Sequence, residues 1–477
     1  MNPNENAEKK IILIVGDSFV DENWLMSRVD IYHSYNVGKE HYISKPLNTD
    51  SRIISFCGAA SLWRMLHGPK DPPDQERLIR SRYELIGLSA WNPGDASLLR
   101  CLLCNEADAT KGLTPFRLSG LRAPHAAKNS DAPVCPISSR PCGFAPLVFN
   151  LVKELDQEAE RHTSSNRLIR LYEGFGSDQP CLQYRFDWRL DLEDKYKNYD
   201  IIDSIKKKIA GRTVAAIAVV DHGYGVVDAR LIGNLCRHFP DARWYVRCKM
   251  ESAPWMEGLT KSRKALRLIF TDEQLLEYRY GVRVWRHGPA VLGRAALEVL
   301  GDLLGMPTFR HGRAIPAQGL PAENAALLFA DDTAIAASRT EAGEGDDAFL
   351  INISGAPGEK KPIHVGRSTV FFASLVYWDL MVHGLDKSLS VACRWALRNA
   401  YRWTEECTKA WLLQIPSDLG GPFAKAIYGG PEPSYQPASA ESQSDSDRLY
   451  KAAWRRWNES STDLGIIRLA SEEAGNG

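Results

Sequence analysis

The feature that most constrains the fold is a series of short apolar runs, each of which ends in a turn of glycines and polar residues. The first run and its turn are IILIVGDSFVD, from Ile11 to Asp21. A run that is apolar at every position is typical of a strand covered on both faces, as in a parallel sheet. Helical patterns alternate with these runs, for example DASLLRCLLCNEA after YELIGLSAW. The alternation predicts an α/β protein with a doubly wound, mostly parallel sheet, whose ligands bind at the strand ends.

The same alternation continues along the chain. Strand-like segments are NRLIRLYEGFG, TVAAIAVVDHGYG, ARWYVRCKM and LRLIFTDEQLLEY, and ARLIGNLCRHF is helical. Two longer helical patterns follow, STVFFASLVYWDLMVHG and DKSLSVACRWALRNAYRWTEECTKAW, and their apolar faces should pack on the sheet. Trp63, Trp188, Trp378 and Trp395 fall on apolar faces, so we interpret them as core or interface residues.

Changes of composition mark three segments outside this pattern. Residues 28–56 are polar with short alternating stretches, which predicts a small β lid that projects from the main sheet. Residues 111–143 are rich in Pro, Ser and Ala, which indicates a loop insertion within a domain that spans 1–415. Residues 416–447 form a Pro- and Ser-rich linker, and 448–477 a short helical tail that we expect to dock on its own domain.

Charge and composition argue against several classes of protein. The chain of 477 residues has 59 basic and 59 acidic side chains, so it offers no basic field to a nucleic acid. It has no apolar run of about 18 residues, and its polar opening MNPNENAEKK does not resemble a signal peptide, so no membrane span is expected. Ten scattered cysteines are typical of reduced thiols. Together these features predict a cytoplasmic protein.

One set of cysteines has the residue types of a zinc site. Cys101 and Cys104 lie close together, and Cys135 and Cys142 follow them. The first pair lies in an apolar helical pattern, where a spacing of three residues places both thiols on one face. We therefore favour a helix core over zinc for this pair.

Several segments resemble, in the right order, the PfkB or ribokinase-like carbohydrate kinases, and most of all their heptose kinase branch. GDSFVDENW is similar to the family's G-D-x-x-x-D turn, which makes Asp17 and Asp21 candidates for binding sugar hydroxyls. CGAASLWRML is similar to the helix start G-G-A-A-N-V-A, where backbone close to the sugar demands glycine. The resemblance implies substrate contacts for Gly58, Ala59 and Ser61, although serine replaces the family's asparagine.

Further segments of the resemblance carry basic residues. NRLIRLYEGFG is similar to the strand beside the heptose substrate, which makes Arg170 a substrate candidate, and Arg185 could join it as a phosphate clamp. Exposed strand arginines are the alternative interpretation. VVDHGYGVVDARLI resembles the branch's S-D-Y-x-K-G turn, in which His222 is either an acid–base group or a turn residue. WYVRCKM resembles its V-D-P-K strand, which implies a nucleotide-side role for Lys249, and Arg247 there replaces an acid.

The segment HVGRSTVFFASL aligns without gaps on the family's V-G-A-G-D-T-V-x-x-x-L loop. That loop forms an anion hole from N–H groups at a helix N-terminus, and its Asp takes the proton of the attacking hydroxyl. The resemblance implies nucleotide or anion contacts for Gly366, Arg367 and Ser368. Thr369 stands at the position of the catalytic Asp. The next acid, Asp379, lies about three helical turns further on, too far to replace it.

A magnesium motif of the family is also altered. FTDEQLLEY falls where the family has P-N-x-x-E, so Gln274 stands for the asparagine and Glu277 keeps the acid. The resemblance, from about residue 10 to 410, implies ATP and Mg²⁺ as cofactors.

The altered motifs favour a degenerate sugar-kinase-like protein without efficient phosphoryl transfer, which binds a sugar or nucleotide or serves as a scaffold. An active kinase for an unusual sugar, heptose or nucleoside and an interaction module stay open as alternatives. The resemblance also implies a homodimer through the β lid, and the C-terminal helices are the alternative surface for a protein partner.

Two further motifs suggest other chemistry. LLFADDTAIAAS contains Asp331 and Asp332, an acid pair that also occurs in the magnesium-binding hairpins of reverse transcriptases. No upstream polymerase acid motif and no basic composition accompany the pair, so we interpret it as a strand hairpin. ISGAPGEKKP lacks the spacing of a phosphate-binding loop and is typical of a surface turn.

Overall fold

The architecture is taken from a computed structural model, which describes part of the chain. The described residues are 9–33, 40–46, 52–67, 79–89, 148–150, 167–173, 181–188, 205–206, 209, 211–248, 259, 266–272, 300, 308–310, 313–315, 322–329, 333–338, 347–352, 366–382, 384–385, 389–412 and 465–469.

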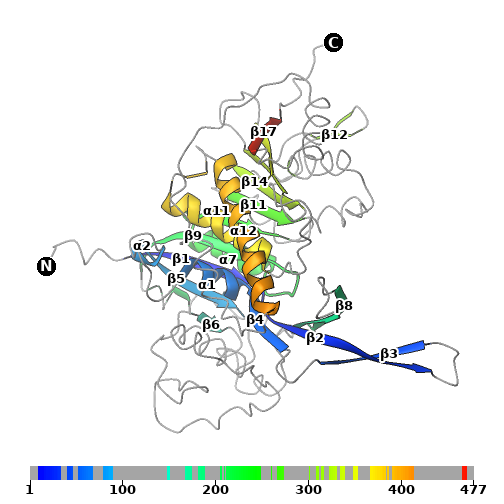
Figure 1. Cartoon of the computed structure of the whole chain (residues 1–477). Helices are drawn as coiled ribbons and strands as arrows, with labels where there is room; N and C mark the ends of the chain where they lie inside the picture. The colour runs from blue at the N-terminus through cyan, green and yellow to red at the C-terminus, as the bar shows by residue number, and fades with distance from the viewer. Residues whose placement is uncertain are drawn as a thin grey trace, which may run out of the picture.

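A ten-stranded sheet forms the centre of the molecule (Figure 1). Seven neighbouring strands are parallel, in the order β14-β11-β10-β9-β1-β5-β6, and β15, β16 and β17 extend the β14 side with antiparallel pairs. The parallel strands are β1 (Lys10–Gly16), β5 (Tyr83–Ser89), β6 (Val148–Asn150), β9 (Val214–Val220), β10 (Arg243–Arg247), β11 (Leu266–Asp272) and β14 (Asn324–Phe329). This sheet confirms the predicted α/β fold class.

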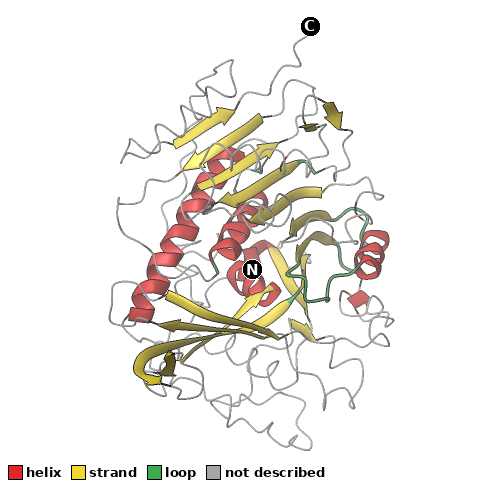
Figure 2. Ribbon diagram, turned by 90° about the vertical axis from the view of Figure 1, so that its right-hand side faces the viewer, coloured by secondary structure: helices red, strands yellow, loops and turns green. Residues whose placement is uncertain are grey.

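Helices cover both faces of the sheet (Figure 2). On one face, α1 (Ala59–His67), α11 (Arg367–Met381) and α12 (Leu389–Leu412) bury a large apolar cluster with the strands. The side chains of β1 alternate between the two faces of the sheet. Ile12 and Ile14 join this cluster, whereas Ile11, Leu13 and Val15 are buried outside it. Both long helices of the sequence prediction are confirmed. The other described helices are α2 (Ile79–Arg82) and α7 (Ala229–His238).

Helix α11 is the central helix of this layer. It is buried almost all round, which is typical of a helix enclosed between a sheet and other helices. Phe371 and Phe372 stack on Phe270 of β11, with ring centroids 5.3 and 5.7 Å apart. Trp63 and Trp378 are fully buried core residues, as the sequence predicted. This packing fixes both ends of α11 relative to the sheet.

A second, five-stranded sheet projects from the body (Figure 1). Its strands are β2 (Ser18–His33), β3 (Glu40–Pro46), β4 (Arg52–Gly58), β7 (Arg167–Glu173) and β8 (Cys181–Trp188). It is larger than the β lid expected over 28–56, because β2 begins at Ser18 and because β7 and β8 join from far along the chain. A separate small hairpin pairs β12 (Thr308–Arg310) with β13 (Arg313–Ile315).

The end of the chain adds the last strand of the central sheet. β15 (Thr333–Ser338), β16 (Asp347–Asn352) and β17 (Gly465–Leu469) run antiparallel in succession. The sequence prediction gave this tail one short helix and no strand, so β17 is new, and the segment expected to be helical lies outside the described residues. The loop insertion at 111–143 and the linker at 416–447 also lie outside them.

Candidate functional site

Strands β1, β9, β10 and β11 end at one edge of the sheet, where the strand order reverses. From β1 the chain runs outward to β5 and β6, and then returns to β9, on the opposite side of β1, before it continues to β10 and β11. Ligands of open α/β sheets bind at such switch points. The residues that end or follow these strands are Asp17, Asp221, Arg247 and Asp272.

Asp17 joins the turn after β1 to the turn after β9. Its carboxylate accepts hydrogen bonds from the backbone N–H groups of His222 at 2.7 Å, Tyr224 at 3.0 Å and Val226 at 3.1 Å. Its backbone carbonyl also accepts from the N–H of Ala59, the first residue of α1. The side chain is fully buried. Both carboxylate oxygens therefore hold the chain's own backbone, and the predicted contact with sugar hydroxyls stays a prediction.

Burial also changes the acidity of Asp17. Loss of solvation raises its pKa to about 7, and the negative charge of Asp221 adds to the rise, whereas the three backbone N–H bonds oppose it. Asp221 itself shapes the turn, because its Oδ1 accepts from the N–H of Gly223 at 2.7 Å. The carboxyl of Asp17 is thus poised to change its charge near neutral pH.

Two glycines allow the backbone to close around Asp17. A Cβ on Gly16 would lie 2.0 Å from the Val220 carbonyl oxygen of β9. A Cβ on Gly58, which has φ 76°, would lie 2.0 Å from the carbonyl oxygen of Asp17. Ala59 and Ser61 are buried at the start of α1. The structure therefore brings the candidates Asp17, Gly58, Ala59 and Ser61 into one corner.

The side chains around Asp21 fill this corner. Asp21 is fully buried on β2, and the thiol of Cys57 donates to its Oδ2 at 3.3 Å. The ring of Phe19 meets those of His222 and Tyr224 edge-on, with centroids 5.1 and 5.3 Å apart. A small apolar cluster results from Phe19, Cys57, Leu168 and Tyr224. This cluster adjoins the candidates Asp21 and Gly58.

At the other side of the switch point, Arg247 contacts the first turn of α11. Its Nη1 donates to Oγ1 of Thr369 and its Nη2 donates to Oγ of Ser368, both at 2.6 Å. Thr369 therefore lies at the sheet edge, beside Arg247. The sequence singled out Arg247 and Thr369 separately, but it did not predict the contact between them.

The start of α11 has the geometry of an anion site. Gly366 takes the N-cap position with φ 79° and provides no side-chain cap. The first bond of the helix runs from the Val370 N–H to the Gly366 carbonyl, so the preceding N–H groups have no partner within the helix. The indole of Trp403 from α12 lies against Gly366, and a Cβ there would be 3.0 Å from its Nε1. Arg367 is buried beside them.

Arg247 is a buried cation with one nearby acid. The guanidinium is 3% exposed, and Asp272 forms an ion pair with it at 3.9 Å, which is a loose contact. Its Nε is buried and has no hydrogen-bond partner. Burial lowers the pKa of Arg247, whereas the charge of Asp272 opposes that change. The N-terminal dipole of α11 adds further positive potential at this point.

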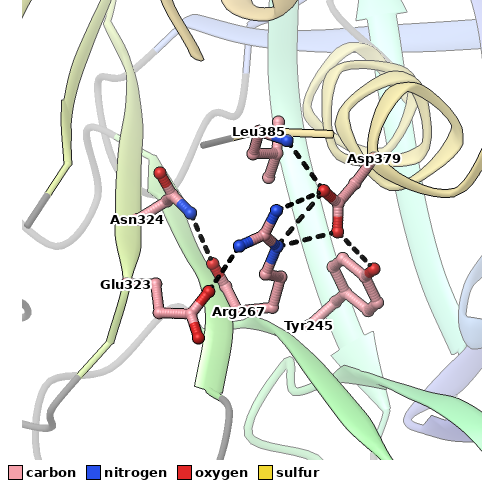
Figure 3. Close-up of polar contacts among 6 residues, drawn as sticks. All are labelled: Tyr245, Arg267, Glu323, Asn324, Asp379 and Leu385. Carbon is pink, nitrogen blue, oxygen red and sulfur yellow. Dashed lines mark hydrogen bonds and ion pairs between the residues drawn. The ribbon is translucent and has the colours of Figure 1, made fainter. Parts of the chain in front are cut away.

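The opposite end of α11 is held by a second arginine (Figure 3). Asp379 accepts from Arg267 of β11, with Nη2 2.8 Å from Oδ1 and Nε 3.0 Å from Oδ2. The Tyr245 hydroxyl donates to the same carboxylate at 2.6 Å, and the Leu385 N–H donates at 2.7 Å. Burial alone would raise the pKa of Asp379, but these bonds hold it below its ordinary value. Asp379 is therefore a structural residue far from Thr369.

The remaining bonds of Arg267 complete this clamp. Its Nη1 donates to Glu323 at 2.5 Å, and its backbone carbonyl accepts from the side-chain amide of Asn324 at 3.0 Å (Figure 3). Tyr245 and Arg247 belong to the same strand, β10, and each contacts α11, one near each end of the helix. The clamp thus sets the position of the first turn of α11 relative to Arg247.

Several predicted site residues lie outside the described part of the chain. They are Lys249, Gln274, Glu277, Asp331, Asp332 and the cysteines Cys101, Cys104, Cys135 and Cys142. Arg170 and Arg185 are paired neighbours on β7 and β8, and only their backbone is described. Asp331 and Asp332 fall between β14 and β15, which form the antiparallel hairpin that the sequence predicted.

The described carboxylates at this edge do not form a metal site. Asp17 accepts backbone N–H groups, Asp221 accepts from its own turn, and Asp272 is paired with Arg247. Within the described ranges no group of three or more His, Cys, Asp or Glu side chains could hold a metal ion. The described cysteines Cys57, Cys236, Cys248 and Cys393 form no disulfide. None of the described helices could cross a membrane.

The arrangement at Thr369 can bind an anion but is poorly suited to accept a proton. A threonine hydroxyl is a far weaker base than a carboxylate, and this one already accepts a bond from a guanidinium. Cationic donors and a helix N-terminus instead favour negative charge.

No family model matches the sequence, and no curated protein matches it either. Similar solved structures include phosphofructokinase-2 from Escherichia coli in complex with fructose-6-phosphate (11% identity, 86% of this chain and 100% of that one, TM-score 0.45). A carbohydrate kinase from Agrobacterium tumefaciens is 11% identical, and the match covers 86% of this chain and 98% of that one with a TM-score of 0.39. A possible 1-phosphofructokinase from Thermotoga maritima has 9% identity, coverage of 84% and 98%, and a TM-score of 0.43. All three TM-scores lie below 0.5, so the fold class rests on the sheet connections alone.

Proposed function

We propose that this chain is a degenerate member of the PfkB or ribokinase-like carbohydrate kinases, which binds a ligand or serves as a scaffold without efficient phosphoryl transfer. The observation that carries the proposal is the pair of 2.6 Å bonds from Arg247 to Ser368 and Thr369. The motif places a proton-accepting Asp where Thr369 stands. By the resemblance, Arg247 replaces an acid and Thr369 replaces the base. These two residues are hydrogen-bonded to each other.

Chemical reasoning gives the size of the defect. A positioned general base contributes about 10²–10⁴-fold to a rate, so its loss leaves at best a slow kinase. A second argument is that Asp21, the other candidate for sugar hydroxyls, is fully buried and accepts a bond from the Cys57 thiol.

The direct test is a phosphoryl-transfer assay on the full chain. ATP and Mg²⁺ are supplied with a panel of hexoses, heptoses, their phosphates and nucleosides, and sugar-dependent ADP release is measured. We expect no release above that of the Thr369→Ala variant, which serves as the matched control. Turnover of about 1 s⁻¹ or faster, the ordinary range of kinases, would overturn the proposal.

An active kinase remains a second candidate because of one observation, the pKa of Asp17 near 7. A base whose pKa lies near the working pH is well matched to proton transfer. Against it, both oxygens of Asp17 already accept backbone N–H groups. The Asp17→Asn and Asp21→Asn variants distinguish the candidates, since an active enzyme would lose its turnover in them while thermal unfolding shows that they still fold.

For partners, we propose a homodimer through the projecting sheet, in a cytoplasmic location that the scattered cysteines favour. Among the described strands β3 pairs with β2, and we propose that its other edge pairs with a second copy. Helix α12 is a less favoured partner surface, because its apolar face packs on α11 and the sheet. Light scattering should show a dimer that becomes a monomer when residues 30–43 are replaced by a two-glycine turn. A monomeric unaltered chain would contradict this.

A further inference from the structure

Asp17 is the residue at which the chain passes from the central sheet into the projecting sheet. β1 ends at Gly16, and β2 begins at Ser18. The chain returns to the body beside this point, because β4 ends at Gly58 and α1 begins at Ala59. The N–H of Ala59 donates to the Asp17 carbonyl at 2.8 Å. The backbone of Asp17 therefore holds together the two connections between the sheets.

The side chain of Asp17 holds a third segment at this joint, the turn of residues 221–226 after β9. The carboxylate accepts three alternate N–H groups of the turn, those of His222, Tyr224 and Val226. Gly223 and Gly225 lie between them with φ 74° and 91°, a conformation that glycine adopts without strain. Such a backbone directs several N–H groups toward one negative charge.

Two rings of the turn pack against the base of the projecting sheet. Phe19 of β2 meets the rings of His222 and Tyr224, with centroids 5.1 and 5.3 Å apart. Tyr224 is also buried in the cluster with Phe19, Cys57 of β4 and Leu168 of β7. A change in the turn would therefore reach three strands of the projecting sheet.

We propose that Asp17 is a pH-sensitive hinge, whose ionised carboxylate fixes the turn 221–226 against the base of the projecting sheet and whose protonated form holds it less tightly. Hydrogen bonds to an ionised acceptor are roughly twice as strong as those to a neutral one. Protonation also converts one of the two accepting oxygens into a donor that faces N–H groups. The change falls near neutral pH, because burial raises the pKa of Asp17 to about 7. The inference concerns the response of the fold to pH and does not depend on the proposed function.

Other titratable groups lie around the joint. Asp221 shapes the same turn, and its negative charge contributes to the raised pKa of Asp17. The other such side chains described on the neighbouring elements are His222 and Tyr224 in the turn, Asp21 on β2, Cys57 on β4, and Arg247 and Cys248 at and just after the end of β10. No acid lies in the first turn of α1. Histidine ordinarily titrates close to neutral pH, so the test must distinguish His222 from Asp17.

The experiment measures amide hydrogen exchange of the full chain by mass spectrometry at pH 6 and pH 8, with rates corrected for the intrinsic effect of pH. Peptides over residues 221–226, 18–24 and 52–58 report on the turn, β2 and β4. We expect the protection of the turn to be lower at pH 6 by at least about threefold, with a smaller loss in β2 and β4. The peptide over β9, residues 214–220, should be equally protected at both values.

Four variants identify the residue that responds and the residue that transmits the response. Asp17→Asn keeps the shape of the side chain but cannot titrate, so the pH response should vanish. His222→Gln should retain the response. Phe19→Ala should retain it in the turn but lose it in β2 and β4. Glu84→Gln is the matched control and should behave as the unaltered protein, because Glu84 is a partly buried acid paired with Arg212 at the opposite edge of the sheet.

Three outcomes would overturn the inference. They are equal protection of the turn at both pH values in the unaltered protein, a response that persists in Asp17→Asn, and a response that disappears in His222→Gln. If Asp17→Asn does not fold, the pH profile of exchange decides, because its midpoint should lie near 7 and stay there in His222→Gln. A turn that responds without any change in β2 and β4 would disprove the hinge.

Discussion

Helix α11 meets the sheet through a buried arginine near each end, and the two arginines have very different surroundings. At the C-terminal end, Arg267 forms a close pair with Asp379, at 2.8 Å, and a second pair with Glu323. At the N-terminal end, Arg247 has two neutral hydroxyls and one acid at 3.9 Å. The guanidinium of Arg267 is held by close carboxylates, whereas that of Arg247 has a buried Nε without a partner and only a loose ion pair. The difference separates a structural contact from a candidate ligand site within one helix.

The largest effect on stability should come from removing the acid that pairs with Arg267 at the C-terminal end of α11. Asp379→Ala leaves the Arg267 charge buried and only partly paired, which typically costs about 3–5 kcal/mol of stability. Denaturant unfolding would measure the loss. Glu323→Gln is the control, because Glu323 is 45% exposed in the ion pair and should contribute less than about 1 kcal/mol. A small loss in Asp379→Ala would show that the two ends of α11 do not differ as described.

Asp17 lies at the same sheet edge as Arg247, and its titration should make the free energy of unfolding depend on pH. Its pKa in the folded protein is raised to about 7, so the folded state holds the proton more tightly than the unfolded chain does. This contribution is fully present below the ordinary value of 3.8 and is lost as pH rises through about 7. The thermal midpoint of the protein should therefore fall between pH 5 and about 8 more steeply than that of Asp17→Asn. Parallel curves for the two proteins would contradict the raised pKa.

A smaller effect should follow from making the two ends alike. Thr369→Asp would place a carboxylate on Arg247 in the way that Asp379 sits on Arg267. We expect a stability change of about 1 kcal/mol or less, because the gain from pairing offsets the cost of burying the new acid. Phosphate binding should weaken, and phosphoryl transfer should not appear, because the guanidinium holds the new carboxylate. Thr369→Val, which removes the hydroxyl alone, is the control, and stronger anion binding in Thr369→Asp would refute the comparison.

The smallest effect concerns Arg247 itself. Exchange of a buried ion for an apolar side chain of similar volume is often neutral for stability, and here no close ion pair would be broken. Arg247→Met should therefore unfold within about 1 kcal/mol of the unaltered protein while its anion affinity falls. A loss as large as that of Asp379→Ala would mean that Arg247 is structural too.

Local patterns in the sequence predicted the elements that build this comparison. The apolar run of β1 and the helical periodicity of α11 were enough to place both elements, whereas the role of Thr369 in the motif HVGRSTVFFASL stays a prediction. These signals are contained within short segments.

The contacts that define the site could not be predicted in the same way. Arg247 and Thr369 are 122 positions apart, and Asp17 and His222 are 205 apart, so no local pattern relates them. The projecting sheet exceeded its expected range because β7 joins β2 from far along the chain. β17 was missed because five residues, GIIRL, are too short to give a clear strand signal without their partner.

The position of β17 also has a consequence for how the protein is made. β16 pairs with β15 on one side, and on the other side with β17, which is synthesised only after α11 and α12. Until β17 is made, the edge of β16 in the nascent chain lacks this partner, and unpaired strand edges can recruit other chains. Synthesis of residues 465–469 therefore covers this edge of β16. A chain truncated before Gly465 would keep the edge of β16 without β17. We expect it to aggregate even though every residue discussed at the switch point is present.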